Sequence, residues 1–509
     1  MRWYEKMSNN IKKGIRNWLN VQEANPYAIN IQEVMDFELS AIRNRVWYRG
    51  DGNELEQMYQ QNPDYADKTK FWASKCSAGL EMRKIHTGLP GLVVRTLTSI
   101  VLTDMNDFDF ANESQEKLWK EIAKKNKFKK KFEKCLKETL YIGEGAYKIT
   151  IDTNVTKYPI LEWYPGERIE YVRSRGEIKE IVFKTPYVVG HKQYVLHEHY
   201  GYGYIKNHLY KGEDEVLLGV IEATKDIKDV AFDTSVMLAV PLMVYESTKF
   251  EGRGGSIFDG KLDNYDALDE AWSQWMDAIR AGRANRYIPD SLIPRDSETG
   301  KIIPPNPFDN RFITIGSDVH EDGRDMVKLD QPSIPHDSYQ ATYCTALDMC
   351  LQGVISPSTL GIDVKKLDNA EAQREKEKTT LYTRNAIIEA LQETLPILVS
   401  ACINAYNILH EKAIAEVQVE IPFGEYANPS FESQVETVGK AKQYGIMSTE
   451  ACVDELYGDT KDENWKQEEI VKLKAEQGIA VLEEPKVRTK AGEFKVNLEG
   501  NRNESQGDK

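Results

Sequence analysis

Long apolar runs are missing from this sequence of 509 residues. The two longest candidates, Val236–Val244 and Leu395–Ile403, are far shorter than the roughly 20 residues that cross a bilayer. The opening residues Met1–Lys6 are polar and lack the apolar core of a secretory signal. We therefore expect no membrane partner and assembly in the cytoplasm, with the two apolar runs folded as a buried strand and a buried helix.

Signatures of metal and nucleotide sites are missing as well. No G-x-x-x-x-G-K-[ST] phosphate loop occurs, and Gly252–Ser256, although rich in glycine, lacks the lysine of such a loop. We interpret Gly252–Ser256 as a loop that leads into the next helix, and we expect no cofactor. The cysteines form no C-x-x-C pair, which is typical of reduced thiols rather than of disulfides or zinc. They are Cys76, Cys135, Cys344, Cys350, Cys402 and Cys452.

An excess of basic charge is also lacking: the sequence has 66 Lys and Arg and 81 Asp and Glu, for a net charge of −15. A protein that grips DNA is basic where it touches phosphate, so this balance argues against a conventional DNA-binding module. Charge alone selects no function, because many enzymes are equally acidic. The 41% hydrophobic content is ordinary for a globular protein, and the length predicts two or more sub-modules.

The clearest pattern that is present predicts a helix that runs out and a second helix that returns. Apolar residues recur at steps of three and four from Leu262 to Ile279, and the helix is expected over 262–288, about 40 Å long, ending at Pro289. A proline-rich excursion with short β-like runs follows. The returning helix is expected from 336 to 354, before Ser356-Pro357 breaks the pattern.

Such a pair of helices cannot bury an apolar face alone, and copies of itself are the simplest neighbours. We therefore expect self-association into a ring. The side chains expected to pack the helices or to face a neighbouring subunit are Leu268, Trp272, Trp275, Ile279, Arg280, Arg283 and Arg286.

A long helix follows a polar, glycine-punctuated loop. Asp368 and Glu371 resemble a capping box, and the helical pattern then runs to about His410. Pro396 lies inside it and predicts a kink, because proline removes one backbone hydrogen bond and clashes with the preceding turn.

The remaining segments predict an α+β protein that is mainly helical. Residues 29–140 read as helices, and Glu416–Ile421 as one strand that pairs with a distant β-rich module or crosses between modules. Short helices follow Pro429, and the tail beyond Glu483 is expected to be disordered. Strands of the β-rich module are expected at Ala146–Asp152, Glu180–Lys184, Gln193–Tyr200, Tyr204–Leu209 and Val216–Ile221.

Together these parts resemble the portal proteins of tailed bacteriophages, of the type found in phages with long, non-contractile tails. The match covers most of residues 30–480, and the order and spacing of the parts carry it, since no single motif is diagnostic. The stretches that match are Leu140–Ile149, Ile160–Arg168, Gly176–Phe183, Leu262–Pro289, Ser356–Gly361 and Asn369–Lys378.

The resemblance implies a structural, non-enzymatic ring, usually of twelve subunits, at one vertex of the capsid. Double-stranded DNA passes through its channel during packaging and ejection, driven by a separate terminase motor. Further implied partners are a major capsid or scaffolding protein and a head-tail connector protein, and the implied location is the virion. An acidic channel fits this role, because repulsion from carboxylates keeps DNA from adhering.

The resemblance also implies a division of the chain. The loop before the long helix would enter the tunnel, so that Lys365 and Lys366 would meet the DNA backbone. The alternative interpretation is that they are simply two exposed lysines on a loop. The implied parts are an N-terminal arm (1–28), a wing (29–255), a first stem helix (256–288), a clip (289–335), a second stem helix (336–354), a tunnel loop (355–368), a kinked wing helix with a strand (369–428), a helical crown (429–482) and a disordered tail (483–509).

Several clusters have both a functional and a plainer interpretation. Lysines 124–137 interleave with Phe128 and Phe132, either as a nucleic-acid stripe or, as we favour, with the rings in the core and the lysines in solvent. The arginines Arg280, Arg283 and Arg286 either contact DNA or an acidic neighbour, or offset the dipole at the end of their helix. The strand-borne histidines His197, His199 and His208, with His191, are not expected to hold a metal.

Two other classes of function remain open. The outgoing helix carries a carboxylate stripe that a metal-dependent nuclease would need, although a solvated or subunit-facing stripe is the interpretation we favour. Cleavage of a plasmid with Mg²⁺, lost on Asp266→Ala and Asp269→Ala, would identify that activity. A capsid or tail adaptor without a channel would instead form small oligomers or filaments without a pore. The stripe consists of Asp263, Asp266, Asp269, Glu270 and Asp277.

Overall fold

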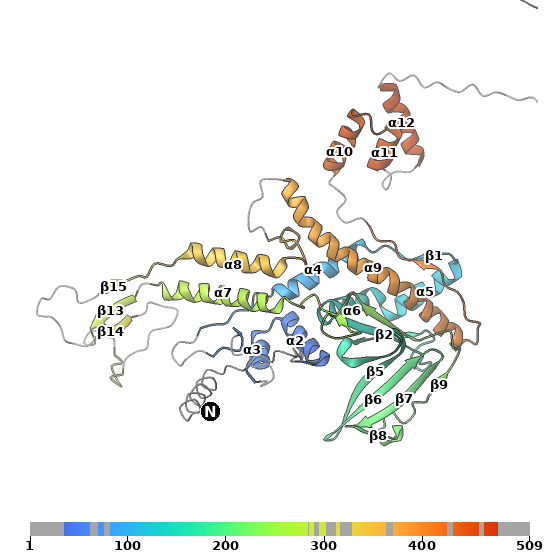
Figure 1. Ribbon diagram of the computed structural model, residues 1–509, viewed down its shortest axis with the longest axis horizontal. Coiled ribbons are helices and arrows are strands. Elements are labelled where there is room, and N and C mark those ends of the chain that lie inside the picture. The colour runs from blue at the N-terminus through green and yellow to red at the C-terminus, as the bar shows by residue number, and fades with distance from the viewer. Residues whose placement is uncertain are drawn as a thin grey trace, which may run out of the picture. The chain divides into compact units, whose positions relative to one another are not determined.

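The chain forms two compact units in the computed structural model, residues 1–424 and residues 425–509. The fold is α+β, and helices take up more of the described chain than strands do (Figure 1). The described residues are 35–61, 70–75, 82–283, 285–289, 295–301, 312–315, 328–362, 370–424, 431–457 and 463–476.

Helices dominate the first part of the larger unit, as the apolar periodicity predicts. Side-chain caps start two of them: Asp36 accepts a hydrogen bond from the Leu39 N–H at 2.8 Å, and Asn112 accepts one from the Ser114 N–H at 2.9 Å. Lys127 separates the last two in a left-handed conformation, with φ at 52°. The helices are α2 (Phe37–Arg49), α3 (Gly52–Gln61), α4 (Leu89–Asp104), α5 (Glu113–Asn126) and α6 (Phe128–Ile142).

Two antiparallel sheets follow, one of three strands in the order β10-β2-β3 and one of six, in which β4-β5-β6-β7-β8 lie in order and β9 pairs with β7. Four of the five strands expected here are confirmed. The fifth, Val216–Ile221, is wrong, because β8 ends at Val216 and a 3-10 helix takes Leu218–Val220. The strands are β2 (Glu144–Thr150), β3 (Ile160–Pro165), β4 (Ile169–Ser174), β5 (Glu177–Val189), β6 (Lys192–Gly201), β7 (Tyr204–Lys211), β8 (Asp214–Val216), β9 (Val230–Ala231) and β10 (Ala239–Met243).

The strand expected at Glu416–Ile421 is shorter and lies elsewhere. Only β16 (Val419–Glu420) is a strand, and it pairs antiparallel with β1 (Asp109–Phe110) beside α5, not with the β-rich module. Alternation of side chains predicts a strand but not its partner, which tertiary packing decides.

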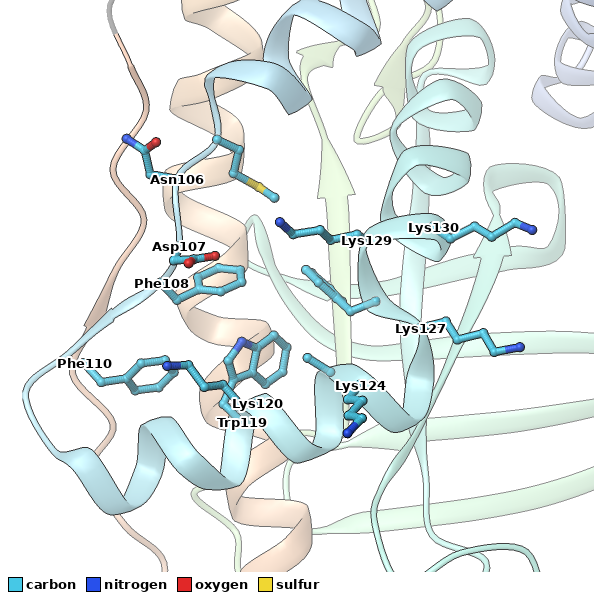
Figure 2. Close-up of a pocket in the computed structure, with 13 residues that line it drawn as sticks. Asn106, Asp107, Phe108, Phe110, Trp119, Lys120, Lys124, Lys127, Lys129 and Lys130 are labelled. Carbon is cyan, nitrogen blue, oxygen red and sulfur yellow. The ribbon is translucent and has the colours of Figure 1, made fainter. Parts of the chain in front are cut away.

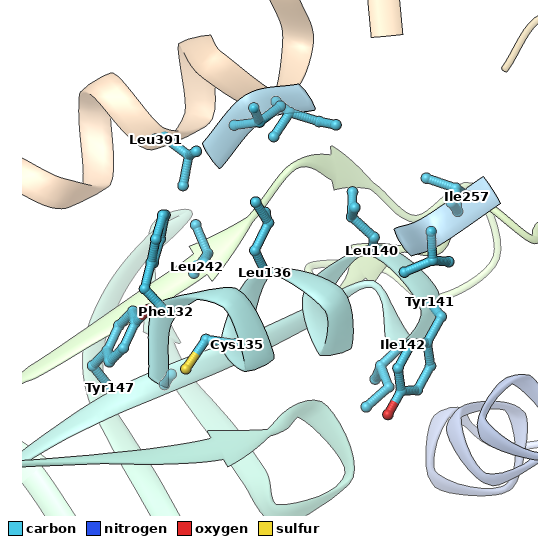
Figure 3. Packing of buried hydrophobic residues seen from close by; sticks show 14 of the residues in the cluster. Phe132, Cys135, Leu136, Leu140, Tyr141, Ile142, Tyr147, Leu242, Ile257 and Leu391 are labelled. Carbon is cyan, nitrogen blue, oxygen red and sulfur yellow. The ribbon is translucent and has the colours of Figure 1, made fainter. Parts of the chain in front are cut away.

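The core of the larger unit lies where α6 and α9 (Ala370–Leu409) cover β2 and β10. Figure 3 shows Leu391 of α9 pointing toward Phe132 of α6 and Leu242 of β10. Phe128 and Phe132 are 4% and 0% exposed, so the interpretation that these rings face the core is confirmed.

Helix α9 is also the one described helix that is long and apolar enough to cross a membrane, over Lys378–Leu409. This corrects the expectation that no segment qualifies. Half of its most apolar window is buried inside the chain, as in the core helix of a globular protein. Its buried residues include Leu395, Leu398 and Cys402.

The smaller unit contains three described helices, α10 (Phe431–Gln443), α11 (Thr449–Tyr457) and α12 (Glu463–Glu476). Gly445, with φ at 70°, follows the first of them, as expected of a glycine that ends a helix. Gly458 and Gly478 and the tail 483–509 lie outside the described residues.

The glycine-rich segment at 252–256 packs tightly against residues 143–144 rather than forming an open loop. Gly254–Gly255 is the short strand β12, paired with β11 (Tyr245–Glu246). A Cβ on Gly143 would lie 2.4 Å from the Gly254 carbonyl oxygen, so the two backbones need glycine at this contact. The approach places the Gly254 N–H against the carboxylate of Glu144.

Glu144 is fully buried, with Oε1 2.7 Å from Nη2 of Arg253, and burial raises the pKa of Glu144 to about 7. A carboxyl whose folded pKa is raised contributes stability that is present at low pH and lost as pH rises through the folded value. The quantity to measure is the free energy of unfolding of the unchanged chain minus that of Glu144→Gln. We expect this difference to fall by about 2 kcal/mol from pH 5 to pH 8. Urea titrations across this range would measure it, with exposed Glu222→Gln as the control. A difference that stays level or rises with pH contradicts the expectation.

Candidate functional site

Two antiparallel helices, α7 (Leu262–Ala281) and α8 (His336–Leu351), form a hairpin (Figure 1). The expectation of a helix over 262–288 is therefore wrong at its end, and α7 is about 30 Å long rather than 40 Å. Gly282 ends it: its N–H bonds the Ala278 carbonyl at 2.8 Å, and a Cβ there would lie 2.5 Å from the Ile334 side chain. The contact with Ile334 therefore requires glycine at position 282, and glycine is a poor residue inside a helix.

A small sheet lies between the two helices along the chain. Strand β13 (Asn285–Pro289) is its centre, parallel to β14 (Phe312–Ile315) and antiparallel to β15 (Lys328–Asp330). The β-like runs expected in the excursion are thereby confirmed. Arg286 lies on β13 and Arg283 beyond the end of α7, so the expected stripe of three arginines along the last turns of the helix does not exist; only Arg280 is in the helix.

Four aromatic rings hold the hairpin together, and we call them the aromatic clasp: Trp272, Trp275, Tyr339 and Tyr343. The centroids of Trp272 and Tyr343 are 5.4 Å apart, and the rings of Trp275 and Tyr339 stack at 6.4 Å with an angle of 8°. Each of the four is still partly exposed. Such pairs contribute about 0.5–1.5 kcal/mol beyond the area they bury.

The base of the hairpin, below the clasp, is well buried, in contrast to the distal part. Leu268 is 0% exposed and belongs to the core, so it packs within its own chain. The Lys261 ammonium binds the carbonyls of Met349 at 3.1 Å and Gln352 at 2.7 Å, near the end of α8. In the distal part, which begins within the clasp, no described residue of 274–281 or 336–346 is buried, and Ile279 is 44% exposed.

The carboxylate stripe is divided between the core and the surface. Asp269 is 0% exposed and accepts hydrogen bonds from the Trp72 indole N–H at 3.1 Å and from the N–H and hydroxyl of Thr87 at 2.8 and 2.9 Å. Its Oδ2 lies 2.6 Å from Nδ1 of His86. Both interpretations drawn from the sequence are wrong here, because Asp269 is neither solvated nor free to bind a metal.

Asp266 is the second buried acid. It accepts hydrogen bonds from the N–H groups of Phe71 at 2.8 Å and Trp72 at 3.3 Å, and burial raises its pKa. The Ser273 hydroxyl accepts a further bond from the Ile85 N–H at 2.9 Å. These contacts fix one face of α7 to the segments 70–75 and 82–88, and we call them the carboxylate anchor.

The other acids of the stripe lie nearer the surface. The Asp263 side chain is 79% exposed and pairs with Lys70, Glu270 accepts a bond from Gln274, and Asp277 is partly exposed. No group of three or more His, Cys, Asp and Glu able to hold a metal occurs in the part of the chain that is described. Among the strand histidines, His199 and His208 contact Glu180 and Glu215 instead, at 3.0 and 2.6 Å.

The remaining predicted site residues are Lys365, Lys366 and Pro396. Both lysines lie outside the described residues. Pro396 is inside α9, which continues as helix on both sides of it. The kink at Pro396 stays a prediction.

Among solved structures, one similarity is weak in both fold and sequence. A chain from the virion of a native gene transfer agent particle has a TM-score of 0.35 and 13% sequence identity, over 75% of this chain and 89% of that chain. A similarity of this size does not decide the function. No protein-family model matches the sequence, and no curated protein matches it.

Proposed function

We propose that this chain is the subunit of a portal-like ring, which forms a structural, non-enzymatic channel for double-stranded DNA at one vertex of a phage-type capsid. The observation that supports this proposal most strongly is the exposure of the distal half of the α7–α8 hairpin, where no described residue of 274–281 or 336–346 is buried. Partly exposed Trp275 and exposed Ile279 lie on this part of the hairpin, which the described residues of the chain leave uncovered.

Ring closure resolves this exposure. Hairpins packed side by side around an axis cover one another's apolar surface, and a closed ring leaves no unpaired edge. Tryptophan, tyrosine and arginine are the residues that dominate the binding energy of protein interfaces, and the exposed half of the hairpin carries all three. The clasp residues and Ile279 would then serve both the hairpin and its neighbours.

The order of the parts supports the same proposal. A wing with two sheets precedes the hairpin, a small sheet lies between the helices, and a 40-residue helix and a separate helical unit follow. The net charge of −15 suits a bore through which DNA slides without adhering. Lys365 and Lys366 would give transient, salt-screened contacts to the DNA backbone. Terminase, a capsid or scaffolding protein and a head-tail connector are the partners such a ring would have.

Purified full-length protein is expected to form closed rings with a central hole, of one dominant size near twelve subunits. Negative-stain electron microscopy and mass photometry would measure this over a range of salt and protein concentrations. Small oligomers or filaments without a pore would favour a capsid or tail adaptor. A folded monomer under every condition would contradict the proposal.

A further inference from the structure

A cavity of about 440 Å³ lies between the α5–α6 junction and residues 105–110 (Figure 2). Its volume is within the roughly 300–1,000 Å³ of ligand-binding clefts. The floor is aromatic, made by Phe108, Phe110, Trp119 and Phe128. We call this cavity the aromatic socket.

The rings of the floor pack against one another by their edges. Phe108 and Trp119 are 5.4 Å apart at 90°, and Trp119 and Phe128 are 5.2 Å apart at 71°. Trp119 and Phe128 are only 2% and 4% exposed. Little open ring face is left for stacking on a nucleobase, which nucleic-acid platforms require. The floor suits an inserted aliphatic side chain instead.

The rim of the socket is strongly basic. Five lysines line it against one carboxylate, that of Asp107, and Lys120 pairs with Glu116. Within the described part of the chain, no ion pair forms at the other four. A concentration of unpaired ammonium groups on a chain of net charge −15 favours an acidic partner. These four are Lys124, Lys127, Lys129 and Lys130.

An acidic surface with an exposed apolar spot lies at the β8 edge of the six-stranded sheet, at residues 213–220, and we call it the acidic tip. Glu213, Asp214 and Glu215 are all exposed, and of these Glu215 contacts His208. Directly after them, Leu217 is 82% exposed and Val220 is 52% exposed.

The exposure of Leu217 follows from the way its neighbours pack. Val216 and Leu218 lie against the small cluster that contains Leu196 and Leu209, so the side chain between them points outward. Leu217 caps the start of the 3-10 turn and Val220 is its last residue, three residues apart, a spacing at which side chains eclipse. The tip therefore carries one apolar spot beside two carboxylates that have no ion pair within the described residues.

We propose that the acidic tip of one copy of this chain docks in the aromatic socket of a neighbouring copy. Leu217 enters the aromatic floor, and Glu213 and Asp214 meet the lysines of the rim. Because tip and socket are different surfaces, the contact is head-to-tail, which is the type of contact that closes rings. The inference rests on the proposed ring, and it names a contact that would hold neighbouring subunits of that ring in a fixed order.

The test uses the full-length chain and measures the protein concentration at which half of it is assembled. Leu217→Asp, and separately Lys124→Glu with Lys127→Glu, are each expected to raise that concentration by about tenfold or more. Two matched controls should leave it unchanged: Val188→Asp, at a residue 70% exposed, and Lys117→Glu with Lys125→Glu, which makes the same charge change outside the socket. Circular dichroism would establish that each variant is folded.

Exchanging the charges of the tip and the socket is the most decisive part of the test. Glu213→Lys with Asp214→Lys should weaken assembly, and adding Lys124→Glu with Lys127→Glu to the same chain should restore it. If the unchanged chain assembles and the tip and socket variants assemble equally well, this contact is overturned while the ring stands. If the unchanged chain stays monomeric, the ring itself fails. Loss of duplex-DNA binding in the socket variant with assembly unchanged would also overturn the contact, in favour of a nucleic acid.

Discussion

Replacing Asp269 with alanine is expected to lower the free energy of unfolding by about 3 kcal/mol or more. The reason is the carboxylate anchor: Asp269 is fully buried and accepts hydrogen bonds from Trp72 and from two groups of Thr87. Its removal leaves buried donors without a partner and leaves a cavity beside His86, whose side chain is 3% exposed. Urea unfolding followed by tryptophan fluorescence would measure the loss.

The matched control is Asp263→Ala on the same helix. The Asp263 side chain is 79% exposed and pairs with Lys70, so we expect a loss of no more than about 1 kcal/mol. Equal effects at the two positions would contradict the anchor. Purified chain incubated with plasmid and Mg²⁺ gives an independent readout, because cleavage that Asp269→Ala abolishes in a folded protein would favour the nuclease.

Replacing Ile279 with aspartate is expected to abolish ring formation while the chain remains folded. Ile279 is 44% exposed on the distal half of α7, so a polar side chain there costs the monomer little. In a ring, the same change would place an unpaired carboxylate in every contact between hairpins, and the cost is repeated at each interface. Mass photometry would show the loss as a shift from rings to monomers.

A conservative change at this position separates interface chemistry from general damage. Ile279→Leu keeps the apolar surface and is expected to keep the rings. Rings that persist in Ile279→Asp would show that this side chain lies outside the contact, and rings lost in both variants would point to the shape of the hairpin rather than to its polarity.

The helix pair was predictable from sequence because its apolar period is continuous, but its length was not. The residues after Gly282 are compatible with a helix, and the Ile334 side chain packs over that glycine, where any Cβ would clash. Ile334 is 52 residues further along the chain, where no local pattern connects it to the helix end. The same limitation applies to β16, whose pairing with β1 depends on a segment some 300 residues away.

The carboxylate anchor was missed for a different reason. Asp266 and Asp269 fall on the same face of α7 as Tyr265 and Leu268, which are core positions by period. A carboxylate on an apolar face predicts a buried partner, and that signal was present in the sequence. The partners themselves are backbone and side-chain groups of Phe71, Trp72 and Thr87, and these residues form no identifying pattern.

The uneven burial along the hairpin implies a gradient of local stability. At its base, the carboxylate anchor and core residues tie α7 to the segments 70–75 and 82–88, whereas no described residue of 274–281 or 336–346 is buried. Segments with few buried contacts open at lower free energy than the core to which they are attached. The free end of this rod can therefore bend or splay while its root keeps its place, so that an opening bordered by such ends would adjust in width without any subunit unfolding.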